Sequence, residues 1–123
     1  MTRVLVCGGR DYQDERAVHE ALDRLHQDRT ISFIIHGACV DREGNLTGAD
    51  RWAETWALRN EVPYCGMPAL WTAEGHAAGP IRNRKMLAKG RPDVVLAAPG
   101  GTGTEHMKSE ARKAGVEVIE VET

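Results

Sequence analysis

The sequence predicts a doubly wound α/β fold, in which a parallel five-stranded sheet of order 3-2-1-4-5 carries helices on both faces. Three observations lead to this prediction. Short apolar runs of strand length alternate with segments whose apolar residues recur at helical spacing. Glycine-rich turns follow the first and the fourth of these runs. No linker or internal repeat interrupts the 123 residues, so residues 1–123 are expected to form a single domain.

Five strands are expected, at residues 3–7, 31–36, 62–67, 93–98 and 116–121. The first and fourth are almost wholly apolar, which is typical of strands buried on both faces of a parallel sheet. Pro63 removes a ladder donor from the third strand, and the fifth alternates only in part, so both are expected at edges of the sheet.

Four helices are expected, at residues 14–27, 48–57, 80–90 and 105–114. The second has the clearest apolar face, which indicates that it packs on the sheet. That face consists of Ala49, Trp52, Ala53, Trp56 and Ala57. Pro80 suits the first turn of the third helix and Gly90 suits its end. Residues 38–47 and 68–79 are expected to be long loops, and loops of that length are often functional.

The bulk composition excludes several classes of function. The 16 basic and 18 acidic residues give a net charge of −2, which argues against electrostatic capture of nucleic acid. Aromatic residues make up only 5% of the chain, which argues against a stacking surface for single strands. No run approaches the roughly 18 apolar residues of a membrane span, and the first strand starts too early for a signal peptide. The odd number of cysteines, without a CxxC pair, predicts reduced thiols in the cytoplasm. Their spacing suits no zinc motif, so neither a metal site nor a cofactor is expected.

The two glycine-rich turns are expected to share one crevice. In the order 3-2-1-4-5 the winding reverses between strands one and four, and ligands bind at such a switch point. The turns are Gly8-Gly9-Arg10-Asp11 and Pro99-Gly100-Gly101-Thr102-Gly103-Thr104. Glycine lets a phosphate approach the backbone, and the amides of the following helix start favour an anion. The second turn matches neither the dinucleotide fingerprint nor the Walker P-loop. The alternative to an anion-binding role is that it is an ordinary tight turn between a strand and a helix.

Several side chains beside the crevice are candidates for ligand contact. Arg10 is expected to contact phosphate. Asp11 either binds a ribose hydroxyl or a base amine, or it caps the first helix. Arg82 and Asn83 are candidates for phosphate and base recognition.

Carboxylates and a histidine near the turns are further candidates. Asp50 is either a ligand-facing carboxylate or a helix-start residue, and His36, before Gly37, is more often structural than functional at such a position. Glu105, with His106, is an acid/base candidate. The alternative is that Glu105 only stabilises the start of the helix through its interaction with the helix dipole.

These motifs, together with Gly48-Ala49-Asp50-Arg51 and the run Gly79-Pro80-Ile81-Arg82-Asn83-Arg84-Lys85-Met86, resemble the YspA-like branch of the SLOG superfamily. That branch is Rossmann-like and occurs in bacteria and phages. The resemblance implies a nucleotide or nucleotide-derived ligand, bound at the turns above, at Gly37 and at Asp50. Residues 39–47 read as an insertion relative to the compact His-Gly-Gly-Ala loop of the branch, either a lid or a partner contact.

A related group, the LOG phosphoribohydrolases, cleaves the N-glycosidic bond of nucleoside monophosphates. Its signature is Pro-Gly-Gly-x-Gly-Thr with a catalytic Glu after two further residues, and an Arg in a context similar to Arg84-Lys85. Met107 stands at the position of that Glu, and Glu105 lies two residues earlier, about 200° away on a helix.

Two main hypotheses follow, and a third is weaker. The first is a domain that binds or senses a nucleotide or nucleotide derivative. The second is a nucleoside-monophosphate N-glycosidase with Glu105 or Asp50 as the carboxylate and Arg84 steering the leaving group. The third, a single-strand DNA-binding protein, is disfavoured by the charge balance. A homodimer is possible through Trp52, Trp56 or Trp71, if exposed.

Overall fold

The computed structural model describes residues 1–122, and its centre is one sheet of five parallel strands. The predicted strand order is confirmed, since the strands lie in the order β3-β2-β1-β4-β5 with β3 and β5 at the edges. Strand β3 is shorter than predicted. The strands are β1 (Thr2–Cys7), β2 (Ile31–His36), β3 (Tyr64–Gly66), β4 (Val94–Ala97) and β5 (Glu117–Glu120).

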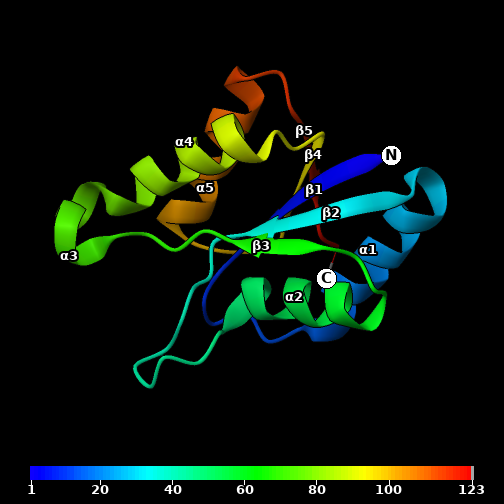
Figure 1. The fold of residues 1–123 in the computed structure, drawn as a ribbon, viewed down its shortest axis with the longest axis horizontal. Coiled ribbons are helices and arrows are strands. Elements are labelled where there is room, and N and C mark those ends of the chain that lie inside the picture. Colours follow the sequence, from blue (N-terminus) through cyan, green and yellow to red (C-terminus); the bar gives the residue numbers. More distant parts are fainter. Residues whose placement is uncertain (123) are drawn as a thin grey trace.

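Helices cover both faces of this sheet, as the alternating pattern predicts. Helices α1 (Glu15–Arg29) and α2 (Gly48–Arg59) pack on one face, and α4 (Ala78–Gly90) and α5 (Thr102–Lys113) on the other (Figure 1). The segment 68–79 is not a plain loop. It contains the short helix α3 (Trp71–Glu74), whose amides at Ala73 and Glu74 bond to the Leu70 carbonyl, and the 3-10 turn η1 (Gly75–Ala77).

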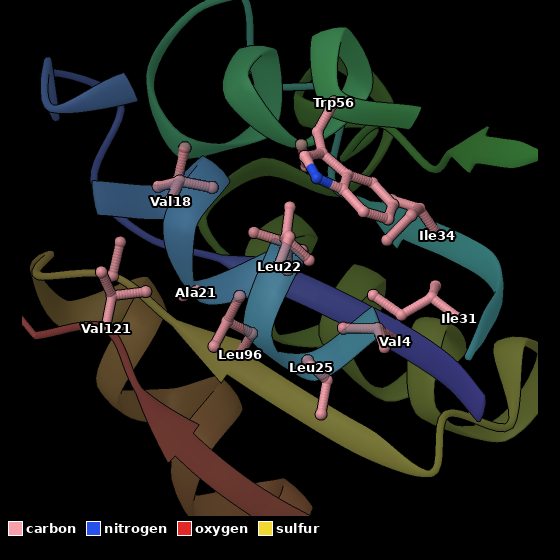
Figure 2. Close-up of a cluster of buried hydrophobic side chains, with 14 of the residues drawn as sticks. Val4, Val18, Ala21, Leu22, Leu25, Ile31, Ile34, Trp56, Leu96 and Val121 are labelled. Carbon is pink, nitrogen blue, oxygen red and sulfur yellow. The ribbon is translucent and has the colours of Figure 1, made fainter. Parts of the chain in front are cut away.

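The larger core lies between the sheet and the α1–α2 layer (Figure 2). Trp56, 1% exposed, packs there with Leu22 and Ile34, and its indole Nε1 donates to Asp23 Oδ1 at 2.8 Å. The opposite core, under α4 and α5, is smaller and contains Met86 and Met107. Strands β1 and β4 pair in parallel and contribute side chains to both cores, and this fixes the edge of the sheet from which the glycine-rich turns leave.

One helix start decides between two open alternatives, and another lies well before its predicted position. Asp14, not Asp11, caps α1, because its Oδ1 accepts from the Ala17 amide at 3.0 Å. Helix α5 begins at Thr102, three residues before the predicted start, and its first bond runs from the Glu105 amide to the Gly101 carbonyl at 3.1 Å. The pattern of apolar residues gives no sign of this extra turn, because Thr102, Gly103 and Thr104 contribute little to the helical periodicity.

The connection between β2 and α2 is ordered into a small hairpin that projects from the molecule (Figure 1). Val40 and Leu46 form an antiparallel bridge, and Asp41 Oδ1 accepts from the amides of Glu43 and Asn45 at 2.9 and 3.0 Å. Gly44 takes a φ of +83° at the tip, which favours glycine. The segment read as an insertion is therefore a folded projection with its own hydrogen bonds.

Candidate functional site

The two glycine-rich turns meet at the carboxyl ends of β1 and β4. The Ala98 amide donates to the Cys7 carbonyl at 2.8 Å, and one step further the Gly9 amide donates to the Pro99 carbonyl at 2.9 Å. Residues roughly ninety positions apart in the chain therefore form one continuous floor.

Glycine is required in this floor because other elements press on it. A Cβ on Gly8 would lie 2.7 Å from the Ala49 Cβ and 2.8 Å from the Ala98 Cβ, both closer than real contacts. A Cβ on Gly100 would lie 2.7 Å from the Gly9 amide nitrogen. These glycines let the two turns and the start of α2 pack against each other.

A cleft of about 670 Å³ opens above the turns. Its size is that of pockets for small organic ligands. Every residue proposed from the sequence for ligand binding lines it: Gly8, Gly9, Arg10, Asp11, Gly37, Asp50, Arg82, Asn83, Pro99, Gly100, Gly101, Thr102, Gly103 and Thr104.

The first turn of α5 lines this cleft and carries unpaired amides. Within residues 1–122, no hydrogen bond uses the amides of Thr102, Gly103 or Thr104. Gly101 and Gly103 have no conformational or steric need for glycine, because neither has a positive φ and a Cβ on either would meet nothing within 4 Å. Their missing side chains leave the amides accessible from the cleft.

Asp50 supplies a buried carboxylate to the cleft wall. The residue is 7% exposed, lies in the first turn of α2, and its Oδ2 accepts from the Cys39 amide at 3.0 Å. Burial raises the pKa of the Asp50 carboxyl above its usual range, although the Cys39 hydrogen bond and the nearby Arg82 guanidinium oppose that rise. Asp50 is thus both a helix-start residue and a group facing the cleft.

His36 has a structural role. It is 1% exposed, its Nδ1 accepts from the Ala38 amide at 3.0 Å, and its Nε2 lies 2.9 Å from Glu54 Oε1. With Nδ1 accepting, Nε2 carries the proton that it donates to Glu54. Both ring nitrogens are therefore occupied in shaping the strand end that carries Gly37.

Helix α4 ties the two sides of the cleft together. Arg82 Nη1 donates to the Gly37 carbonyl at 2.7 Å, and Arg82 Nε donates to Asn83 Oδ1 at 3.1 Å. The Asn83 Nδ2 in turn donates to the Gly103 carbonyl at 3.2 Å. Much of the hydrogen-bonding capacity of Arg82 is therefore used on protein groups, whereas Arg10 is exposed at the cleft and has no ion-pair partner among residues 1–122.

The two residues proposed as catalytic, Glu105 and Arg84, do not line the cleft. The Glu105 side chain is 66% exposed and pairs with Lys108 at 2.9 Å, on the side of α5 that faces β5. Arg84 is 60% exposed and pairs with Glu110 at 3.3 Å. The geometry does not favour a catalytic role for this pair at the cleft, because Glu105 is paired within α5 and Arg84 is paired with α5, and neither side chain lines the cleft.

Other lining residues escaped the sequence reasoning: Val6, Cys7, Tyr12, Cys39, Trp71, Gly79 and Met86. Burial raises the pKa of the Cys7 thiol to about 12, so Cys7 is an unreactive part of the wall. The Tyr12 hydroxyl is covered but has no hydrogen-bond partner among residues 1–122. Tyr12 follows Asp11 directly, and this adjacency was the available signal; for Trp71 there was none.

Three further findings bear on the expected partners. Within residues 1–122, no helix has the length and apolar character to cross a bilayer. The His, Cys, Asp and Glu side chains of the same residues form no group of three that could hold a metal ion. Of the three tryptophans considered for a dimer contact, Trp56 is buried and Trp52 half-buried, whereas Trp71 is 54% exposed.

The parallel order β3-β2-β1-β4-β5, with a cleft where the winding reverses, defines a Rossmann-like protein. Comparison with known proteins narrows this class. The model of the YspA, cpYpsA-related SLOG family matches residues 2–73, and the chain belongs to that family.

One sequence relative and one solved structure extend the comparison. The Gene 61 protein of Mycobacterium phage D29 is 40% identical over 126 residues, covering 97% of this chain and 95% of that protein. The structure of the Moco carrier protein from Chlamydomonas reinhardtii superposes with a TM-score of 0.60 over 98% of this chain and 76% of that one. At 16% identity, the second likeness concerns the fold alone.

Proposed function

We propose that this chain binds a nucleotide or a nucleotide-derived small molecule, with the ligand's phosphate on the first turn of α5. One observation carries the proposal: two glycine-rich turns, joined by the Gly9–Pro99 hydrogen bond, form the floor of a cleft, and the first turn of α5, which carries unpaired amides, lines it. A helix start of this kind attracts an anion through its free N–H groups and its dipole.

Charge and hydrogen-bonding groups around the cleft support an anionic ligand with polar substituents. The Arg10 guanidinium is available for a phosphate. Asp11 is free of the capping role that Asp14 takes, and its exposed carboxylate suits a ribose hydroxyl.

Substitutions at Gly101 test the phosphate position without disturbing the fold. Gly101 is the N-cap of α5, where Asp and Asn are both favoured, and a Cβ there meets nothing within 4 Å. Gly101→Asp adds a negative charge beside the free amides, and Gly101→Asn has nearly the same shape without the charge. We expect both variants to fold, and we expect Gly101→Asp to lose the affinity for AMP that Gly101→Asn retains in larger part.

Calorimetric titration with AMP and with ribose 5-phosphate measures the outcome. Wild-type protein should bind both, and a ligand at about 100 times its dissociation constant should add about 2.7 kcal/mol to the free energy of unfolding. Equal affinity of AMP for wild-type protein and Gly101→Asp would show that the phosphate does not lie at α5. No binding of either compound to wild-type protein would remove the proposed function.

A second candidate is a nucleoside-monophosphate N-glycosidase with Asp50 as the carboxylate. The specific observation is a 7% exposed carboxylate in the cleft wall whose pKa is raised by burial, as suits a group that transfers protons. Release of free base from a panel of nucleoside monophosphates, abolished by Asp50→Asn, would establish it. No base release by wild-type protein from any member would exclude it.

The proposal also includes three expectations, about the cellular compartment, nucleic acid and the oligomeric state. The free thiols of Cys7, Cys39 and Cys65 suit a reducing compartment, and we place the protein in the cytoplasm. A nucleic-acid partner is disfavoured by the net charge of −2. A homodimer is possible, and mass measurement in solution decides it.

A further inference from the structure

Trp71 differs from the other two tryptophans in having a largely exposed ring. Trp71 is 54% exposed, whereas Trp56 is 1% exposed. Trp52 packs against the core, and its Nε1 donates to the Tyr12 carbonyl at 2.9 Å. Within residues 1–122, the Trp71 indole nitrogen has no hydrogen-bond partner. Burial of such a ring stabilises a protein, so an exposed one at a pocket commonly serves recognition.

Trp71 lines the cleft from a segment of the chain other than the two glycine-rich turns. Trp71 lines the cleft from α3, which lies beyond the start of α4 (Figure 1). A Cβ placed on Gly79 would be 3.4 Å from Trp71 Cη2, so the six-membered ring rests over the first turn of α4. One part of the indole is therefore supported by backbone, while the remainder stays accessible.

The cleft is larger than a phosphate group needs. Its volume of about 670 Å³ matches pockets that enclose a whole organic molecule. The anion-binding groups come from the turns after β1 and β4, and Trp71 comes from the segment after β3. A ligand that filled the cleft would thus have a charged group at the turns and a flat apolar group at the indole.

We propose that Trp71 is the stacking surface for the base of the bound nucleotide, and that nucleoside phosphates are therefore preferred over sugar phosphates. The inference rests on the function proposed above, because it needs the phosphate at α5. An exposed indole suits this role because every base has a flat face that stacks on it.

The test compares two probes that differ by the base, AMP and ribose 5-phosphate, on three variants. Trp71→Ala removes the ring and Trp71→Phe keeps an aromatic face. Leu70→Ala is the matched control, because Leu70 is 49% exposed, precedes α3 and does not line the cleft. Calorimetry gives the affinities. The difference in tryptophan fluorescence between wild-type protein and Trp71→Phe gives the contribution of Trp71, separate from that of Trp52 and Trp56.

We expect Trp71→Ala to weaken AMP binding by on the order of 10- to 100-fold and to leave ribose 5-phosphate binding unchanged. Trp71→Phe should keep most of the affinity, and Leu70→Ala should behave as wild type. AMP should quench the fluorescence of wild-type protein, and the quenching should vanish in Trp71→Phe.

The outcomes separate the two proposals. If wild-type protein binds ribose 5-phosphate but Trp71→Ala changes the AMP affinity no more than the ribose 5-phosphate affinity, the stacking role is wrong and the phosphate site stands. If Trp71→Ala instead lowers the mass of the protein in solution with AMP affinity intact, Trp71 belongs to a dimer contact and the stacking role is again wrong. If wild-type protein binds neither probe, the phosphate site fails and the stacking role fails with it.

Discussion

Gly103→Ala should make the protein more stable and a poorer binder. Gly103 is the second residue of α5, has no positive φ, and a Cβ there would meet no atom within 4 Å. Replacing glycine by alanine at such a helical position raises the free energy of unfolding by about 0.4–1 kcal/mol. For a domain of this length that corresponds to a rise of roughly 2–4 °C in Tm. The added methyl group would meanwhile obstruct the approach of a phosphate to the α5 amides.

Thermal unfolding followed by circular dichroism, combined with titration of ribose 5-phosphate, measures both effects. We expect a higher Tm and an affinity lower by on the order of ten-fold, equivalent to about 1.4 kcal/mol. Gly100→Ala is the contrasting variant, because its Cβ would crowd the Gly9 amide and the Thr104 side chain, and its Tm should fall. A Gly103→Ala protein that gains stability and binds as tightly as wild type would refute the phosphate assignment at α5.

Three further predictions concern stability. Ala38→Gly should raise the free energy of unfolding by on the order of 0.5 kcal/mol in urea titrations, because Ala38 has a φ of +51° that L-residues adopt at a cost; an unchanged midpoint would contradict this. Asp50→Asn should gain stability over wild type as the pH rises above about 4, since the raised pKa means that ionising Asp50 costs more in the folded state than in the unfolded state. The gain in the free energy of unfolding should level off above the folded-state pKa of Asp50. Stability curves of wild type and variant that run parallel from pH 4 to 8 would show that folding does not raise the pKa of Asp50. Trp56→Ala should cost on the order of 3–5 kcal/mol, with Trp56→Phe costing less, and a loss under 1 kcal/mol would contradict the core packing.

The sheet and the place of the cleft were predictable from the sequence. Apolar runs alternating with helical segments allow few arrangements once crossovers must be right-handed, and the order 3-2-1-4-5 is one of them. That order places the turns after β1 and β4 side by side, so the two stretches rich in glycine indicate one crevice from the sequence alone.

The direction of individual side chains was not predictable in the same way. Glu105 was a reasonable acid/base candidate by its distance from the glycine turn, but its side chain pairs with Lys108, which also pairs with Glu120 on β5 at 2.7 Å. Which side of a helix faces a cleft depends on partners remote in the chain, and local spacing contains no information about them. The predicted start of α5 was three residues late for a different reason, which is local: glycine and threonine in the first turn give weak helical signals.

The sequence by itself determined the topology of this protein, because strand burial and helix amphipathicity are written in the periodicity of neighbouring residues. Only the tertiary structure decided that Asp50 is buried, that Arg82 bonds to the Gly37 carbonyl, and that Trp71 from a short helix borders the same cleft. These properties arise from contacts between segments far apart in the chain. Their physical origin is the packing of whole elements, which sets desolvation and side-chain direction only once the fold has formed.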